Sequence, residues 1–293
     1  MGYNLNMSDA VESSPQSDTR IRGLLRREKY PIPELRSVVD EIFYATQGGP
    51  FNVRILASRV EQDSLITQKI LSITSNPYYC GTSKIKNIIS LIQRFGPAGF
   101  RCVALQAFLD TDLYKVQHPY QQELLTIRNY SLVCAHVARI ISRHTGANGD
   151  LAFLCGLLHR IGMSVPLILH PNYADTPTSS QDFYLALNGA HPVFGATVAQ
   201  RWGMPEEVVL AIANHGQIAL EGAVSLYSAT IVLAEAITQK LGYQLKTFKK
   251  IPRNAPYSPQ ESSEHALSAL GIPKETLQLL LREASQVLTF ELV

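Results

Sequence analysis

The chain has 293 residues, of which 46% are hydrophobic and only 17% carry a formal charge. This balance excludes an intrinsically disordered chain, and the length suffices for one large or two small hydrophobic cores. The formal net charge of +2 argues against a general attraction to nucleic acid or to a membrane surface. The polar residues 1–20 do not form a signal peptide, and we find no apolar run of membrane-spanning length. We therefore expect a cytoplasmic globular protein with no membrane partner.

The four cysteines are too far apart in the sequence to form the close pairs that a zinc site uses. They are Cys80, Cys102, Cys134 and Cys155, and none belongs to a C-x-x-C motif. We expect buried thiols in a reducing compartment, with neither a zinc cage nor a disulfide framework.

The first half of the chain shows the apolar spacing of short α-helices joined by short turns. Leu35, Val38 and Val39 follow the i, i+3, i+4 pattern of one helix face, and Asp63 has the position of a helix cap. The pattern predicts helices that open at Pro33, cover 53–60, follow Asp63, cover 85–95 up to Gly96-Pro97, and cover 98–110. We find no convincing strand pattern in this half.

The second half is helical as well. The predicted helices are 121–144, a helix that is capped by Asp150 and ends at Gly162, 182–188, His191 to Trp202, Pro205 to His215, 222–241 and 274–288. The polar residues 172–181 predict a loop, and the prolines and serines of 247–264 predict a linker before the last helix. Residues 1–20, rich in Ser, Asp and Asn, predict a mobile tail.

Several separate segments carry a resemblance to one known family, and they occur in the family's order. They are Leu56 to Asp63, Lys69 to Asn76, Ile85 to Gly96, Gly156 to Gly162, His191 to Gly195, Trp202 to Glu207 and Ala211 to His215. Through them the chain resembles the HDOD family, bacterial signalling modules related to the HD-domain metal phosphohydrolases. The resemblance implies an all-α fold of two packed helical subdomains, of which the C-terminal one is HD-domain-like. We expect these subdomains at 21–118 and 119–243, followed by a linker and a C-terminal helix at 244–293.

The resemblance also implies where the metal ligands of an HD enzyme would fall: a first His, a His-Asp pair, two further His and a late Asp. In this sequence the six positions are Tyr130, His159, Arg160, His191, His215 and Glu235. Three imidazoles and one carboxylate therefore remain, whereas the first His and the bridging Asp are replaced. His136 cannot stand in for the first His, because six residues along a helix turn by about 240°.

Arg160 decides how these residues are interpreted. Arginine is always charged and has no lone pair to give to a metal, so a guanidinium at the place of the bridging Asp opposes a divalent ion. We expect no catalytic residue, no bound metal and no cofactor, with a single ion held by the imidazoles and Glu235 as the alternative. Glu235 is the only formal charge between Glu221 and Lys240, so we predict that it pairs with Arg160.

A purely structural interpretation of two of these residues stays open. In it, His215 caps a helix end before Gly216, and Arg160 faces solvent just before a helix stop at Gly162. The position that the resemblance assigns to each residue is the only argument for a functional role at this point.

Three functions follow as hypotheses. The first is a non-catalytic signalling module that binds a partner protein. The second is a sensor in which Arg160 and the three histidines bind a phosphate-bearing nucleotide or another anion. The third is a metal-dependent phosphohydrolase. The basic runs Arg26 to Lys29 and Lys246 to Arg253 are interpreted as solvated segments, so we expect no nucleic-acid partner.

Overall fold

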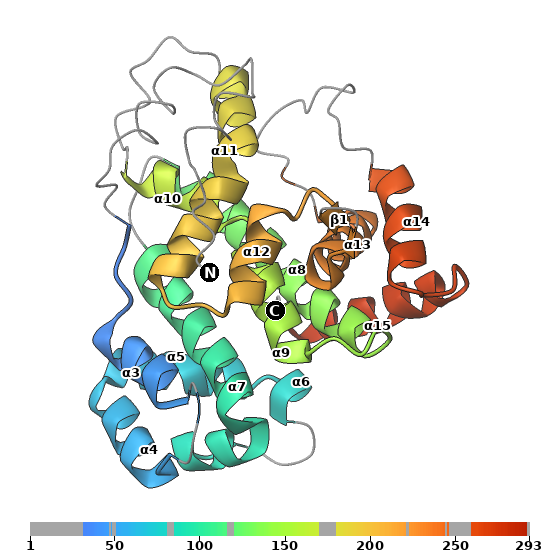
Figure 1. Ribbon diagram of the computed structural model, residues 1–293. Helices are drawn as coiled ribbons and strands as arrows, with labels where there is room; N and C mark the ends of the chain where they lie inside the picture. The colour runs from blue at the N-terminus through green and yellow to red at the C-terminus, as the bar shows by residue number, and fades with distance from the viewer. Residues whose placement is uncertain are drawn as a thin grey trace. The chain divides into compact units, whose positions relative to one another are not determined.

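The structure is a computed structural model in which almost every described residue outside turns is helical (Figure 1). It describes residues 32–46, 48, 51–80, 85–115, 120–169, 180–220, 223–243, 245 and 259–291. The contacts divide the chain into two compact units, Glu34–Val116 with Arg282–Val293 and Met1–Pro33 with Gln117–Leu281. The all-α fold class is therefore confirmed, and the four-part division of the chain stays a prediction.

The Glu34–Val116 unit is built around one long helix. Its elements are α3 (Ser37–Thr46), α4 (Val53–Gln62), α5 (Ser64–Thr74), α6 (Pro77–Cys80), α7 (Ile88–Phe108) and the π-helical turn η1 (Leu109–Leu113). Helix α7 packs against α3, α4 and α5, and their apolar faces form the core. The side chain of Asp63 accepts a hydrogen bond from the Ile66 N–H, so the predicted cap of α5 is confirmed.

Two predicted helix starts in this unit are wrong by a few residues. Helix α3 begins at Ser37, four residues after Pro33. Helix α7 begins at Ile88, because the side chain of Asn87 accepts a hydrogen bond from the backbone of Ser90 and so caps the helix there. The break at Gly96 is real, since this glycine has φ 68° and ψ 178° and kinks the long helix.

The Gln117–Leu281 unit holds the longest helices. Its elements are α8 (Gln121–Ser142), α9 (Gly149–Leu158), α10 (Ile161–Leu169), α11 (Ser180–Arg201), α12 (Glu206–Ala213), β1 (Ala219–Leu220), β2 (Ala223–Val224), α13 (Leu226–Lys240), α14 (Pro259–Ala269) and the start of α15 (Thr276–Glu291). Helix α8 packs against α9 and α13, while α11 packs against α10 and α12. The two short strands pair antiparallel, with Ala219 opposite Val224, and the second lies where the sequence predicted the start of a helix.

Several helix boundaries in this unit differ from the prediction, and α13 starts at Leu226 where a start at 222 was predicted. Asn148, not Asp150, caps α9, because its side chain accepts hydrogen bonds from two backbone N–H groups in the first turn. Helix α9 ends at Leu158 and α10 starts at Ile161, so Gly162 lies inside a helix and stops none. Helix α11 runs through Pro192 as one helix instead of two. Residues 259–264, predicted as linker, begin α14.

One apolar stretch is longer than the sequence analysis allowed. The segment Gly149–Ile168 is long and apolar enough by composition to cross a membrane, so the statement that no such run exists is wrong. However, 83% of it is buried inside the structure, where α9 contacts α8 and α10 contacts α11. Its apolar character is therefore that of a core segment.

Several predictions fall on residues outside the described ranges. These are the tail at 1–20, most of the loop at 172–181, the linker between 247 and 258 and both basic runs. Among the cysteines, Cys102, Cys134 and Cys155 are buried thiols, as predicted.

Candidate functional site

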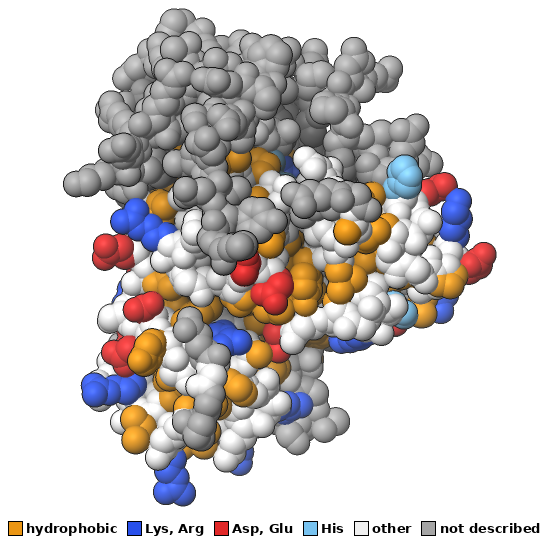
Figure 2. Space-filling model, viewed as in Figure 1, with side chains coloured by type: hydrophobic (Ala, Val, Ile, Leu, Met, Phe, Trp, Pro, Cys, Tyr) orange, Lys and Arg blue, Asp and Glu red, His pale blue; other side chains and the backbone are white. Residues whose placement is uncertain are grey.

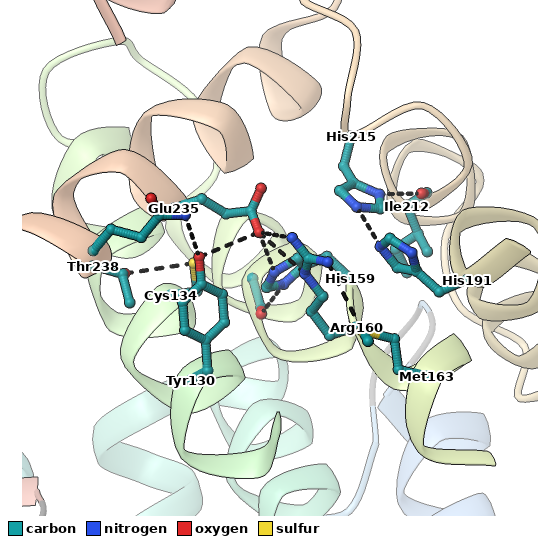
Figure 3. Close-up of polar contacts among 12 residues, drawn as sticks. Tyr130, Cys134, His159, Arg160, Met163, His191, Ile212, His215, Glu235 and Thr238 are labelled. Carbon is teal, nitrogen blue, oxygen red and sulfur yellow. Dashed lines mark hydrogen bonds and ion pairs between the residues drawn. The ribbon is translucent and has the colours of Figure 1, made fainter. Parts of the chain in front are cut away.

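The six positions that the resemblance assigned come together in the Gln117–Leu281 unit (Figure 3). They are Tyr130 on α8, His159 and Arg160 in the turn between α9 and α10, His191 on α11, His215 just after α12, and Glu235 on α13. None of the six residues is more than 9% exposed, so they form a buried polar cluster inside an apolar core. The interpretation of Arg160 as a solvent-facing residue is therefore wrong.

Two glycines let the helices that carry this cluster approach one another closely. A Cβ on Gly156 would lie 2.6 Å from the Cα of Ala135, where α9 crosses α8. A Cβ on Gly162 would overlap the carbonyl O of His191 and lie 2.5 Å from the N of Gly195, where α10 crosses α11. Since any larger residue would push these backbones apart, the two glycines fix the turn that holds His159 and Arg160.

Arg160 and Glu235 form a buried ion pair. The Arg160 guanidinium donates to Oε1 of Glu235 from Nη2 at 2.5 Å and from Nε at 3.1 Å. Its Nη1 donates to the side-chain oxygen of Asn188 at 3.0 Å and lies 3.8 Å from the sulfur of Met163. The predicted pairing of Arg160 with Glu235 is confirmed, and every nitrogen of the guanidinium has an acceptor within the protein.

The same carboxylate oxygen is the centre of the cluster. Oε1 of Glu235 also accepts a hydrogen bond from the Tyr130 hydroxyl at 3.4 Å and lies 3.3 Å from Nε2 of His159. Burial raises the pKa of Glu235, but the charge of Arg160 and the contact with His159 outweigh it and hold that pKa well below its usual value. Glu235 is therefore ionised at neutral pH.

Tyr130 supports this carboxylate as a neutral donor. Burial and the charge of Glu235 raise the pKa of Tyr130 well above its usual value, so the hydroxyl keeps its proton. The side-chain amide of Gln239 in turn donates to the Tyr130 oxygen at 3.3 Å. A phenol thus occupies the position of an HD enzyme's first His and donates a hydrogen bond there, whereas a metal ligand must offer a lone pair.

His159 bridges α9 and α13. Its Nδ1 lies 2.7 Å from the carbonyl O of Gly156, and its Nε2 faces Glu235. His159 therefore links the backbone of α9 to the same carboxylate oxygen that Arg160 and Tyr130 contact.

His191 and His215 face each other. Their Nε2 atoms are 2.9 Å apart, and each Nδ1 lies within 2.7 Å of a backbone carbonyl, that of Asn188 or Ile212. Burial lowers the pKa of both rings, to about 3 for His215, and the charge of Arg160 lowers both further. Both rings are therefore neutral at pH 7. Two neutral rings carry two N–H groups in total. Only two of the three contacts can therefore be hydrogen bonds at one time.

Three residues of the cluster were missed by the sequence analysis. Asn188 and Met163 contact Arg160, and Gln239 contacts Tyr130. Their spacing was a usable signal, because Asn188 is three residues before His191 and Gln239 is four residues after Glu235, on the same helix faces. His136 lies elsewhere, against the ring of Phe153 at a centroid distance of 5.2 Å, as its helical position predicted.

The metal ions of HD enzymes do not fit this arrangement. In the described ranges, no three His, Cys, Asp or Glu side chains are grouped as a metal ion requires. The carboxylate that would bind a metal is engaged by a guanidinium, and a divalent ion beside it would meet that positive charge at low dielectric.

The neutral histidine pair makes stability depend on pH. Because the folded pKa values of His191 and His215 lie below the ordinary value of 6.5, the unfolded chain binds more protons than the folded one below that pH. We expect the free energy of unfolding to fall as pH drops from 7 to 5, by up to about 1.4 kcal/mol per pH unit and ring. Glu235 adds a further loss only below its ordinary value of 4.5.

Urea unfolding at pH 7, 6 and 5 measures this dependence. His215→Gln removes one of the two rings and should flatten the slope, whereas the same change at the exposed His144 should leave it unaltered. A wild-type stability that is constant from pH 7 to pH 5 would contradict the neutral pair.

The fold is similar to that of two crystal structures of bacterial proteins. A candidate metal-dependent phosphohydrolase from Shewanella amazonensis is 17% identical, with a TM-score of 0.70 over 91% of this chain and 98% of that one. A candidate signal transduction protein from Marinobacter aquaeolei is 19% identical, with a TM-score of 0.66 over 97% of this chain and 65% of that one. At such identities the likeness is one of fold.

Sequence comparison gives a curated relative and a family. Ribonuclease Y from Thermus thermophilus is 32% identical over 119 residues, which are 41% of this chain and 17% of that protein. The chain thus spans less than a fifth of this relative's length. A family model described as the HDOD domain matches residues 32–218. Since this match covers well over half of the 293 residues, the chain belongs to the HDOD domain family.

Proposed function

We propose that this chain is a non-catalytic HDOD signalling module that works in the cytoplasm through contacts with a partner protein. Membership of the HDOD family and the fold shared with a candidate signal transduction protein support a signalling role. The absence of catalysis is supported by the contacts of the buried cluster, and the partner protein by membership of a signalling family.

The observation that carries the proposal is the ion pair between Arg160 and Glu235. An HD phosphohydrolase needs a carboxylate with free lone pairs beside its histidines, so that metal ions can activate water and bind a phosphate. Here Glu235 accepts from Arg160 with the oxygen that is central to the cluster, and Tyr130 donates to that same oxygen. The ion pair joins the α9–α10 turn to α13 directly, so Arg160 and Glu235 stabilise the fold at positions where an HD enzyme would bind metal.

The same contacts argue against an anion sensor and against a phosphohydrolase, because they engage the side chain that each function would need. An anion or nucleotide sensor would need the guanidinium of Arg160 for a bidentate phosphate contact, but its nitrogens are bonded to Glu235 and Asn188. A phosphohydrolase would need Glu235 for metal. The names of two relatives, ribonuclease Y and a candidate metal-dependent phosphohydrolase, define the substrates with which hydrolysis should be tested.

Metal content and hydrolysis together test the proposal. We expect full-length protein, incubated with Mn²⁺, Fe²⁺ or Zn²⁺ and desalted, to carry far less than one metal ion per chain by elemental analysis. We also expect no turnover of single-stranded RNA or of a chromogenic phosphodiester with these ions. Stoichiometric metal with hydrolysis that Glu235→Gln abolishes would overturn the non-catalytic function. A nucleotide that raises the melting temperature in wild type but not in Arg160→Met would favour the sensor instead.

A further inference from the structure

The Glu34–Val116 unit carries a polar groove between α3, α4 and the start of α5. Its volume is about 400 Å³, and its lining includes Val38 and Glu41 from α3, Arg59 from α4 and Leu65 from α5. Arg36 also lines it and is held by ion pairs to Asp63 at 3.0 Å and Asp112 at 2.6 Å. Arg36 is therefore already neutralised within the protein, unlike the charged side chains of Glu41 and Arg59.

Two exposed side chains of opposite charge line this groove, Glu41 on α3 and Arg59 on α4. Asp40 and Arg54 are exposed on the same two helices outside the lining, and α4 also carries the exposed Glu61 near its C-terminal end. Glu41 and Arg59 line the same groove but do not pair with each other or with any other side chain in the part of the chain that the structure describes. Glu41 therefore makes the α3 edge of the groove acidic, and Arg59 makes its α4 edge basic.

Two large apolar side chains extend these edges by one helical turn. Tyr44 is 83% exposed and lies three residues after Glu41, on the same side of α3. Ile55 is 63% exposed and lies four residues before Arg59, on the same side of α4. They are the two most exposed large hydrophobic residues among those described. In Figure 2, acidic, basic and hydrophobic side chains lie side by side over α3 and α4.

We propose that the α3–α4 face is an interface with a second copy of this chain. In a two-fold contact each residue meets its complement on the partner, so a face with one acidic and one basic edge is complementary to itself. Glu41 of each copy would meet Arg59 of the other, and Tyr44 and Ile55 would be covered between them. Two helices of ten residues give a face about 15 Å long and about 20 Å wide. Its area of roughly 300 Å² is well below the roughly 800 Å² per partner of a standard interface. The dimer should therefore be weak.

Sedimentation velocity of the full chain tests this proposal. We expect a monomer–dimer equilibrium between about 1 and 200 µM, the range of an interface this small, weakened by added salt. Glu41→Arg and Arg59→Glu should each weaken dimerisation at least tenfold, because like charges then face each other. An equimolar mixture of the two variants should form a heterodimer, since its two copies again present opposite charges at both contacts. Glu275→Arg, an exposed change outside α3 and α4, should have no effect.

Three results would overturn the proposal. The first is a wild-type chain that stays monomeric over the whole concentration range. The second is a dimer that neither charge reversal weakens, which would place the interface elsewhere. The third is a pair of variants that fail to associate when mixed although each has the circular dichroism spectrum of the wild type.

Discussion

Glu235→Gln is expected to destabilise the protein by about 3–5 kcal/mol, because it leaves the charge of Arg160 buried without a counter-ion. Gln keeps the shape of the side chain and its ability to accept a hydrogen bond, so the loss in the free energy of unfolding measures the effect of the missing charge. Arg160 has no route to solvent that would compensate, since its side chain is 11% exposed and that of Glu235 is 3% exposed. Urea unfolding at pH 7 measures the loss as a lower midpoint with an unchanged m-value.

The matched control is Glu61→Gln on α4, an exposed carboxylate that should change stability by less than about 0.5 kcal/mol. If Glu235→Gln is as mild as this control, the ion pair does not hold α13 to the α9–α10 turn. A large loss in both variants would point to a general sensitivity of the fold and would leave the pair without a special role.

Gly162→Ala should be at least as damaging, with an expected loss of about 3 kcal/mol or more. The added methyl group would overlap backbone atoms of His191 and Gly195 on α11, and backbone cannot move aside as a side-chain tip does. Separation of α10 from α11 would also pull His191 away from His215 and Asn188 away from Arg160. Thermal unfolding followed by circular dichroism measures the loss.

Gly216→Ala is the control for this change. Gly216 follows His215, and a Cβ there would meet nothing within 4 Å. We expect Gly216→Ala to unfold within a few degrees of the wild type. Equal melting temperatures for Gly162→Ala and Gly216→Ala would mean that α10 and α11 are not in the close contact described above.

The sequence predicted helix type well and helix ends less well. Apolar spacing located α4 and α5 because each buries one regular face. It also located α8, whose C-terminal half is buried on nearly every side. It misplaced the end of α9, because Gly162 reads as a helix stop in sequence but serves a close helix crossing in space. It also divided α11 at Pro192, a residue that is usually a breaker but that a helix accommodates when packing on both sides compensates. Such tertiary effects are absent from local patterns.

The candidate site was largely predictable because His159, Arg160, His191 and His215 lie on segments that resemble the HDOD family. The pairing of Arg160 with Glu235 followed from the charge balance of one apolar helix, since a buried carboxylate needs a partner. Asn188, Met163 and Gln239 were not predicted, because polar or sulfur-containing residues at helical spacing have many other uses. The contact between His191 and His215 depends on how α11 meets α12, which the sequence does not specify.

A double-mutant cycle on Arg160 and Glu235 tests the central claim most directly. Urea unfolding of wild type, Arg160→Met, Glu235→Leu and the double variant gives the coupling energy of the pair. A buried ion pair that replaces a metal bridge predicts two strongly destabilised single variants, a double variant close to wild type, and a coupling of at least about 2 kcal/mol. Additive losses, with a coupling near zero, would contradict the account and reopen these positions to a ligand or a metal.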